Sequence, residues 1–166
     1  MDRKKTFLFL IPNSLNDFHE RAPWVKVPEA FNDLGFKSIL ICTKYKSNIK
    51  PATQITELAH SKESAKITVP LLSFRYLLKE KPDIIMTPLG RHLVTFIPLI
   101  FIYKTFLRKS KNHAKFILKS DLNLNSFTNN IIIKLFIYIL LIASSYTFDL
   151  VTFESTCSVE KAKKLK

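Results

Sequence analysis

Glycine is scarce in this sequence of 166 residues, with only Gly35 and Gly90 present. Phosphate-cradling loops of the GxGxxG and GxxxxGKS/T kinds need glycines close together, so neither loop occurs here. The HExxH and GxSxG signatures of zinc proteases and α/β-hydrolases are missing as well. The sequence therefore excludes the nucleotide-binding and hydrolytic classes that depend on these motifs.

Cysteine is equally rare. The sequence contains Cys42 and Cys157, which are isolated from each other and have neither CxxC nor metal-ligand spacing. Disulfide-rich secreted domains and zinc sites have several cysteines at short spacings. Cys42 lies in an apolar run, which predicts a buried core thiol. We therefore expect no metal site, no cofactor and a reducing, cytoplasmic environment.

Acidic residues are outnumbered, with 13 Asp or Glu against 26 Lys or Arg, and the net charge is +13. Such an excess favours a polyanionic partner, either nucleic acid or an anionic membrane surface. An AT-rich genome, which favours Lys, Ile, Asn and Phe codons, is an alternative explanation. The sequence has no RRM, helix-turn-helix or zinc pattern, and its aromatic residues lie mainly in apolar runs. We therefore expect no nucleic-acid partner and keep an anionic membrane surface as a candidate.

No apolar run reaches the ~20 residues that a membrane-spanning helix needs. The two longest candidates, residues 93–107 and 131–146, are interrupted by Pro98, Lys104 and Lys134. A central Lys costs about 2.5–3.5 kcal/mol on insertion scales. Three alternatives stay open for these segments: helices buried in a soluble core, interfacial helices on a membrane, or true spans.

Apolar runs alternate with helical patterns along the chain. The first run, Thr6–Ile11, follows basic residues as in a signal peptide, but no small-residue cleavage site comes after it, so we interpret it as a strand. Further strands are predicted at Ser38–Cys42, Lys66–Val69, Asp83–Thr87, Lys115–Leu118 and Leu150–Phe153. Helices are predicted at Trp24–Leu34, where Gly35 supplies the C-cap, and at Leu71–Glu80, Leu93–Leu107, Ile131–Tyr146 and Ser158–Lys166. Lys44–Ser64 is polar and poorly patterned. This alternation predicts an α/β fold over residues 1–166, a Rossmann-like, doubly wound, mainly parallel sheet with helices on both faces.

Ligands of open α/β sheets bind beyond the carboxyl ends of the strands, near the point where strand order reverses. The segment after the first strand contains Asn13 and Ser14, then His19 or Glu20 as a candidate base and Arg21 as a candidate anion-binding residue. The alternative for this segment is a solvated loop.

Two more strand ends carry candidate site residues. Gly90, Arg91 and His92 follow the fourth strand, and an Arg-His pair at a helix N-terminus suits a phosphate or a sugar hydroxyl. A cation there opposes the helix dipole, which favours a functional role over a structural one. Ser120 and Asp121 follow the fifth strand, and Asp121 is a candidate hydrogen-bond acceptor or base. Its alternative role is a helix N-cap or an Asx-turn.

Four segments together resemble the N-terminal domain of GT-B glycosyltransferases of the retaining, family-four type, also called glycosyltransferase group 1. They are residues 5–42, 81–92, 115–123 and 148–166. Residues 81–85 (KPDII) match the start of the family's fourth strand, and residues 149–155 (DLVTFES) match its D-x-hydrophobic-T-x-S segment. The family's Gly pair after the first strand is replaced by Asn13-Ser14. Its strand-five His is absent, with Ser120-Asp121 in that region.

The resemblance implies an acceptor-binding half of a glycosyltransferase. The nucleotide-sugar donor of the family binds mainly in a second, C-terminal Rossmann domain marked by a pair of Glu residues, which residues 1–166 do not contain. We therefore expect a chain that is inactive alone, with His92 and Asp121 orienting the acceptor hydroxyl and His19 and Arg21 at the cleft edge. The expected acceptor is a glycan or a lipid-linked molecule, the donor arrives with a C-terminal domain or partner subunit, and the protein is cytoplasmic, at the inner face of the membrane. The alternative is a non-catalytic, membrane-associated scaffold.

Overall fold

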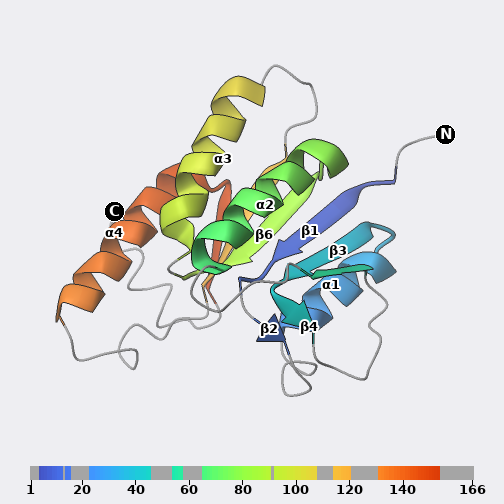
Figure 1. The fold of residues 1–166 in the computed structure, drawn as a ribbon, viewed down its shortest axis with the longest axis horizontal. Helices are drawn as coiled ribbons and strands as arrows, with labels where there is room; N and C mark the ends of the chain where they lie inside the picture. Colours follow the sequence, from blue (N-terminus) through green and yellow to red (C-terminus); the bar gives the residue numbers. More distant parts are fainter. Residues whose placement is uncertain are drawn as a thin grey trace.

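The computed structural model describes residues 4–12, 14–15, 23–45, 54–57, 65–90, 92–107, 114–120 and 131–153, in which strands alternate with helices (Figure 1). The main sheet consists of β1 (Thr6–Leu10), β3 (Lys37–Cys42), β5 (Gln54–Glu57), β6 (Ile84–Pro88), β7 (Lys115–Ser120) and β8 (Leu150–Phe153). The helices are α1 (Pro23–Asp33), α2 (Ala65–Glu80), α3 (Leu93–Leu107) and α4 (Ile131–Thr147). Two short strands, β2 (Ser14–Leu15) and β4 (Lys44–Tyr45), pair with each other in a second, small sheet.

The six main strands are all parallel and lie in the order β5-β3-β1-β6-β7-β8. Numbered along the chain, this is the 3-2-1-4-5-6 order of a Rossmann-like, doubly wound sheet. The order reverses between β1 and β6, which makes the carboxyl ends of these two strands the switch point. All five residues of β1 are buried, because this central strand is covered on both faces, and its sequence is accordingly a continuous apolar run.

Successive side chains of the strands pack into two cores, one on each face of the sheet. One core joins Phe7 and Phe9 of β1 to Val25 and Phe31 of α1, with the rings of Phe7 and Phe31 stacked 3.8 Å apart. The opposite core attaches α2, α3 and α4 to the sheet through Val69, Leu77, Leu93, Phe96, Ile100 and Leu140 (Figure 1). The chain moves from β1 towards one edge of the sheet through β3 and β5, and then crosses back to β6 and moves towards the other edge through β7 and β8. Because these connections are right-handed, α1 lies on one face of the sheet and α2, α3 and α4 lie on the other.

The predicted strand at Lys66–Val69 is wrong, because these residues lie inside α2. In the helix, Val69, Ser73 and Leu77 recur at every fourth position and are fully buried, and the Ser73 hydroxyl donates a hydrogen bond to the Val69 carbonyl at 2.6 Å. Burial of this helical face outweighs the local preference of Ile67, Thr68 and Val69 for a strand.

The edge position of the sheet is instead occupied by β5, in the polar segment where the sequence shows no pattern. Its residues are exposed or half-buried, because an edge strand that is covered on one side does not need an apolar run. The helix predicted at Leu71–Glu80 begins earlier, at Ala65, and the other predicted strands and helices up to Phe153 are confirmed to within about two residues at each end. The predicted helix at Ser158–Lys166 lies outside the described residues. Among the described helices, none is long and apolar enough to cross a membrane.

Two aspartates fix the amino ends of the strands. Asp83 precedes β6, and its Oδ2 accepts a hydrogen bond from the backbone N–H of Thr6 in β1 at 2.7 Å. Asp149 precedes β8, and its Oδ2 accepts from the backbone N–H of Phe116 in β7 at 2.8 Å. Asp83 of the KPDII segment and Asp149 of the DLVTFES segment therefore have structural roles, at the edge of the sheet opposite to the carboxyl ends.

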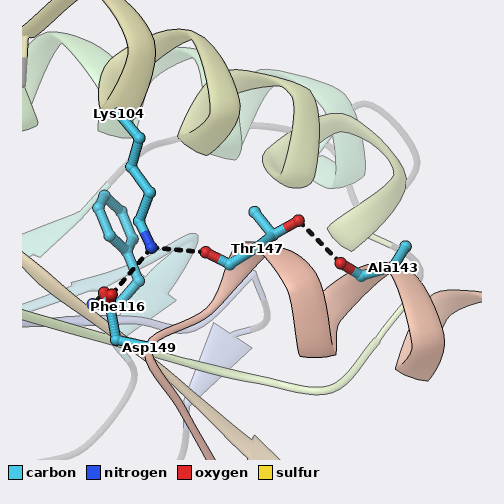
Figure 2. Close-up of polar contacts among 5 residues, drawn as sticks. All are labelled: Lys104, Phe116, Ala143, Thr147 and Asp149. Carbon is cyan, nitrogen blue, oxygen red and sulfur yellow. Dashed lines mark hydrogen bonds and ion pairs between the residues drawn. The ribbon is translucent and has the colours of Figure 1, made fainter.

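Asp149 also anchors two helices through Lys104 (Figure 2). The Lys104 ammonium donates to Asp149 Oδ1 at 3.0 Å and to the carbonyl of Thr147, the last residue of α4, at 2.7 Å. It also lies 5.5 Å from the centre of the Phe116 ring. A cation at the carboxyl end of α4 complements the helix dipole. One lysine thus joins α3, α4, β7 and the start of β8.

Replacing Asp149 by alanine is expected to lower the free energy of unfolding by about 1–2 kcal/mol, because both the Phe116 N–H and the Lys104 ammonium lose a charged partner that is only partly exposed. Urea denaturation measures the loss. Asp33→Ala, on the exposed end of α1, is the matched control and should change stability by less than about 0.5 kcal/mol. Equal effects of the two substitutions would show that the Asp149 contacts do not stabilise the fold.

Candidate functional site

The carboxyl ends of β1 and β6 lie side by side at the switch point, where ligands bind in sheets of this order. Beyond β6, Leu89 and Gly90 form a short turn that leads to His92 and the start of α3. The turn is held to the next strand, since the backbone N–H of Leu89 donates to the carbonyl of Lys119 in β7 at 2.8 Å. The turn after β6 is therefore fixed against β7.

His92 is connected to both strand ends through Thr87. The Nε2 atom of His92 lies 2.9 Å from the Thr87 hydroxyl oxygen, and that hydroxyl donates to the carbonyl of Leu10 at 3.1 Å. The Thr87 hydroxyl therefore links the imidazole to the end of β1, and the imidazole tautomer sets which of the two groups donates in their shared hydrogen bond. Thr87 and Leu10 are fully buried, and His92 is only 2% exposed.

Burial lowers the pKa of His92 from 6.5 to about 4, because the imidazolium would lose its hydration. A backbone hydrogen bond at Pro88 favours the cation and raises the pKa, but this contribution is smaller. The imidazole is therefore neutral near pH 7. His92 is thus an uncharged hydrogen-bonding group at the switch point.

Gly90 is explained by its contact with His92. A β-carbon on Gly90 would lie 2.9 Å from Nδ1 and 3.1 Å from Cε1 of the imidazole, closer than non-bonded atoms pack in proteins. The ring of His92 occupies the space that any other residue at position 90 would fill with its side chain. Gly35 differs, since its φ of +87° matches its predicted role as the C-cap of α1.

The end of β7 adds polar groups one strand away from the switch point. Ser120 is the last residue of β7 and is buried, on the same face of the sheet as Thr87. Lys119 is also buried and lies on the opposite face, in register with Pro88 of β6 and Thr152 of β8. A buried lysine within a strand is unusual, and it was not predicted because the strand was expected to end at Leu118.

The predicted site residues fall into three groups. His92, Gly90 and Ser120 lie at the carboxyl ends of β6 and β7, as expected, and the first two are in contact. Ser14 belongs to β2, whose backbone pairs with β4 rather than with the main sheet. The remaining predicted residues lie outside the described part of the chain: Asn13, His19, Glu20, Arg21, Arg91 and Asp121. Thr87 was not predicted, because a single threonine at a strand end carries no distinctive signal.

Neither metal binding nor thiol chemistry has a candidate group within the described ranges. No group of three or more His, Cys, Asp or Glu residues in those ranges is arranged to hold a metal ion. Cys42 in β3 is buried, as predicted, and burial, together with the nearby Glu57 carboxylate, raises its pKa to about 12. The thiol is therefore protonated and unsuited to act as a nucleophile.

Comparison with protein-family models finds none that matches this chain, and comparison with curated proteins finds no match either. Support for a function comes instead from the strand order, the residues at the switch point and the order of the sequence motifs.

Proposed function

We propose that this chain binds the acceptor substrate of a GT-B-type glycosyltransferase. The observation that carries the proposal is the reversal of strand order between β1 and β6. The segments that resemble the family include the ends of these two strands, and ligands of open parallel sheets bind at such ends. A neutral His92 beside the Thr87 hydroxyl favours a hydroxyl-bearing ligand over a phosphate, since neither group carries charge.

The roles within this proposal follow from burial and position. Because His92 is almost completely buried, we assign it a positioning role, in which it holds Thr87 and the turn after β6 in place. Asp121, which follows β7 in the sequence, is proposed to orient the acceptor hydroxyl. The acceptor is a glycan or a lipid-linked sugar, and the nucleotide-sugar donor is bound by a second domain or a partner subunit. The site of action is the cytoplasm.

Nuclear magnetic resonance of the full chain tests the proposal. Alkyl glucosides and alkyl N-acetylglucosaminides serve as acceptor probes, and UDP-glucose, UDP-N-acetylglucosamine and GDP-mannose serve as donor probes. We expect acceptor probes to shift the backbone amides of Thr87, Leu89, Gly90 and Ser120. The amides of Asp83 and Asp149, at the opposite edge of the sheet, are the internal control and should not move. The donor probes should leave the spectrum unchanged.

The variant Thr87→Val removes the hydroxyl while keeping the shape of the side chain. It should weaken acceptor binding by about fivefold, because the buried Thr87 hydroxyl no longer holds His92 and the turn after β6 in place. Thr105→Val, on the exposed side of α3, is the matched control and should bind normally. Binding of a nucleotide sugar to this chain alone would contradict the proposal, as would acceptor shifts confined to the amino edge of the sheet.

A further inference from the structure

Large apolar side chains are exposed mainly on one side of the molecule. Of the fourteen exposed large hydrophobic residues in the described part of the chain, twelve lie on α2, α3 and α4, and the other two are Leu34 and Leu150. These three helices form one layer on the same face of the sheet, with α3 next to both α2 and α4. The exposed residues are Leu71, Leu78, Val94, Phe101, Ile102, Ile131, Ile132, Leu135, Phe136, Ile139, Ile142 and Tyr146, and we call them the outer apolar surface.

Helix α4 shows that this surface is not a by-product of core packing. Its buried residues, which include Ile137, Leu140, Leu141 and Ser144, lie on one side of the helix. Its seven members of the outer apolar surface, spaced by one, three or four residues, lie on the opposite side. A helix that only covers a sheet needs one apolar side, because the other side faces water. The second apolar side of α4 therefore requires a separate explanation.

The charges around the outer apolar surface are basic. Arg75 and Lys79 are exposed on α2 beside Leu71 and Leu78, and Lys134 is half-exposed on α4. The single acid of the three helices, Glu80, forms an ion pair with Lys37 at 2.7 Å. The sequence between Ile84 and Phe148 contains only one acid, Asp121, against eight basic residues: Arg91, Lys104, Arg108, Lys109, Lys111, Lys115, Lys119 and Lys134.

We propose that the outer apolar surface lies flat on an anionic phospholipid bilayer. Apolar side chains enter the boundary between headgroups and acyl chains, and basic side chains contact the negatively charged headgroups, as in interfacial helices. A second copy of this chain is a poorer partner, because a symmetric contact would bring Arg75, Lys79 and Lys134 of both copies together without acids to pair with them. The inference does not depend on the proposed glycosyltransferase function.

Vesicle flotation of the full chain tests this inference. We expect the protein to float with phosphatidylcholine vesicles that contain phosphatidylglycerol, to bind far less to pure phosphatidylcholine, and to dissociate at high salt, where headgroup charges are screened. Ile139→Asp, at a position that is 55% exposed, should lower the partition coefficient by about tenfold or more. Leu34→Asp introduces the same charge at a residue that is 74% exposed in the turn directly after α1, on the other face of the sheet, and should bind as well as the unmodified chain.

A pair of charge reversals separates local contacts from the overall charge. Arg75→Glu combined with Lys79→Glu should weaken vesicle binding by about tenfold or more, whereas Lys4→Glu combined with Lys5→Glu, which changes the net charge equally at the exposed amino end, should have a small effect. Circular dichroism confirms that each variant is folded. Equal losses in both double variants would overturn the proposal. So would the absence of flotation combined with a dimer in analytical ultracentrifugation that Ile139→Asp dissociates, because a second copy would then cover the surface.

Discussion

Acidification from pH 6.5 to pH 4 should lower the free energy of unfolding by about 3 kcal/mol through His92 alone. The native pKa of about 4 lies below the value of 6.5 expected for an unfolded chain. Between these values the unfolded chain binds a proton that the buried imidazole does not, so stability is complete above pH 6.5 and is lost as the pH falls towards 4. Urea denaturation measured across this pH range gives the slope of the unfolding free energy against pH.

The variant His92→Gln isolates this effect from the titration of carboxylates and of the other histidines. Its amide can take the place of Nε2 beside Thr87, but it has no proton to gain in this range. We expect the difference in unfolding free energy between the unmodified chain and the variant to shrink as the pH is lowered. Parallel pH profiles for the two proteins would mean that His92 is hydrated and does not belong to the buried hydrogen bonds that connect it through Thr87 to the Leu10 carbonyl.

Replacing Phe116 by alanine is expected to lower the free energy of unfolding by about 3–5 kcal/mol, the usual cost of removing a buried phenylalanine ring. Phe116 is fully buried in β7, in the core that joins α2, α3 and α4 to the sheet. Its ring meets Tyr103 edge-on, with the ring centres 5.5 Å apart, and lies beneath the Lys104 ammonium (Figure 2). The substitution therefore removes an aromatic contact and a cation–π contact together with the buried area.

Thermal and chemical unfolding measure the loss, and two variants calibrate it. Phe101→Ala, on α3 at a position that is 66% exposed, should change stability by less than about 0.5 kcal/mol. Phe116→Leu keeps most of the volume and should lose less than Phe116→Ala. A loss of less than about 1 kcal/mol for Phe116→Ala would be incompatible with a packed core on this face of the sheet.

The main sheet could be predicted because its central strands are buried on both faces. A strand such as β1, covered by α1 on one side and by α2 and α3 on the other, has to be apolar at every position, and that pattern is visible in the sequence. The parallel arrangement followed from helical segments between the strands. Gly90 and His92 could be located at the carboxyl edge of the sheet because they directly follow one of these apolar strands in the sequence.

What the sequence did not reveal depends on tertiary contacts. The strand β5 is polar because it lies at an edge, and the segment Lys66–Val69 is helical because Val69 is buried against the sheet. The neutral state of His92 follows from its enclosure, which no local pattern encodes. Asp83 and Asp149 matched family motifs, yet their contacts show that a motif can report a strand-end hydrogen bond rather than a ligand.

The direction of the helices has a consequence for how a substrate would arrive. Helices that connect parallel strands run antiparallel to them, so α3 and α4 begin at the carboxyl edge of the sheet. With the three-helix layer resting on a bilayer, this edge points sideways along the lipid surface instead of away from it. A lipid-tethered substrate would then reach the turn after β6 by lateral diffusion, in a two-dimensional search, whereas a dissolved one would have half of its approach directions blocked by the membrane.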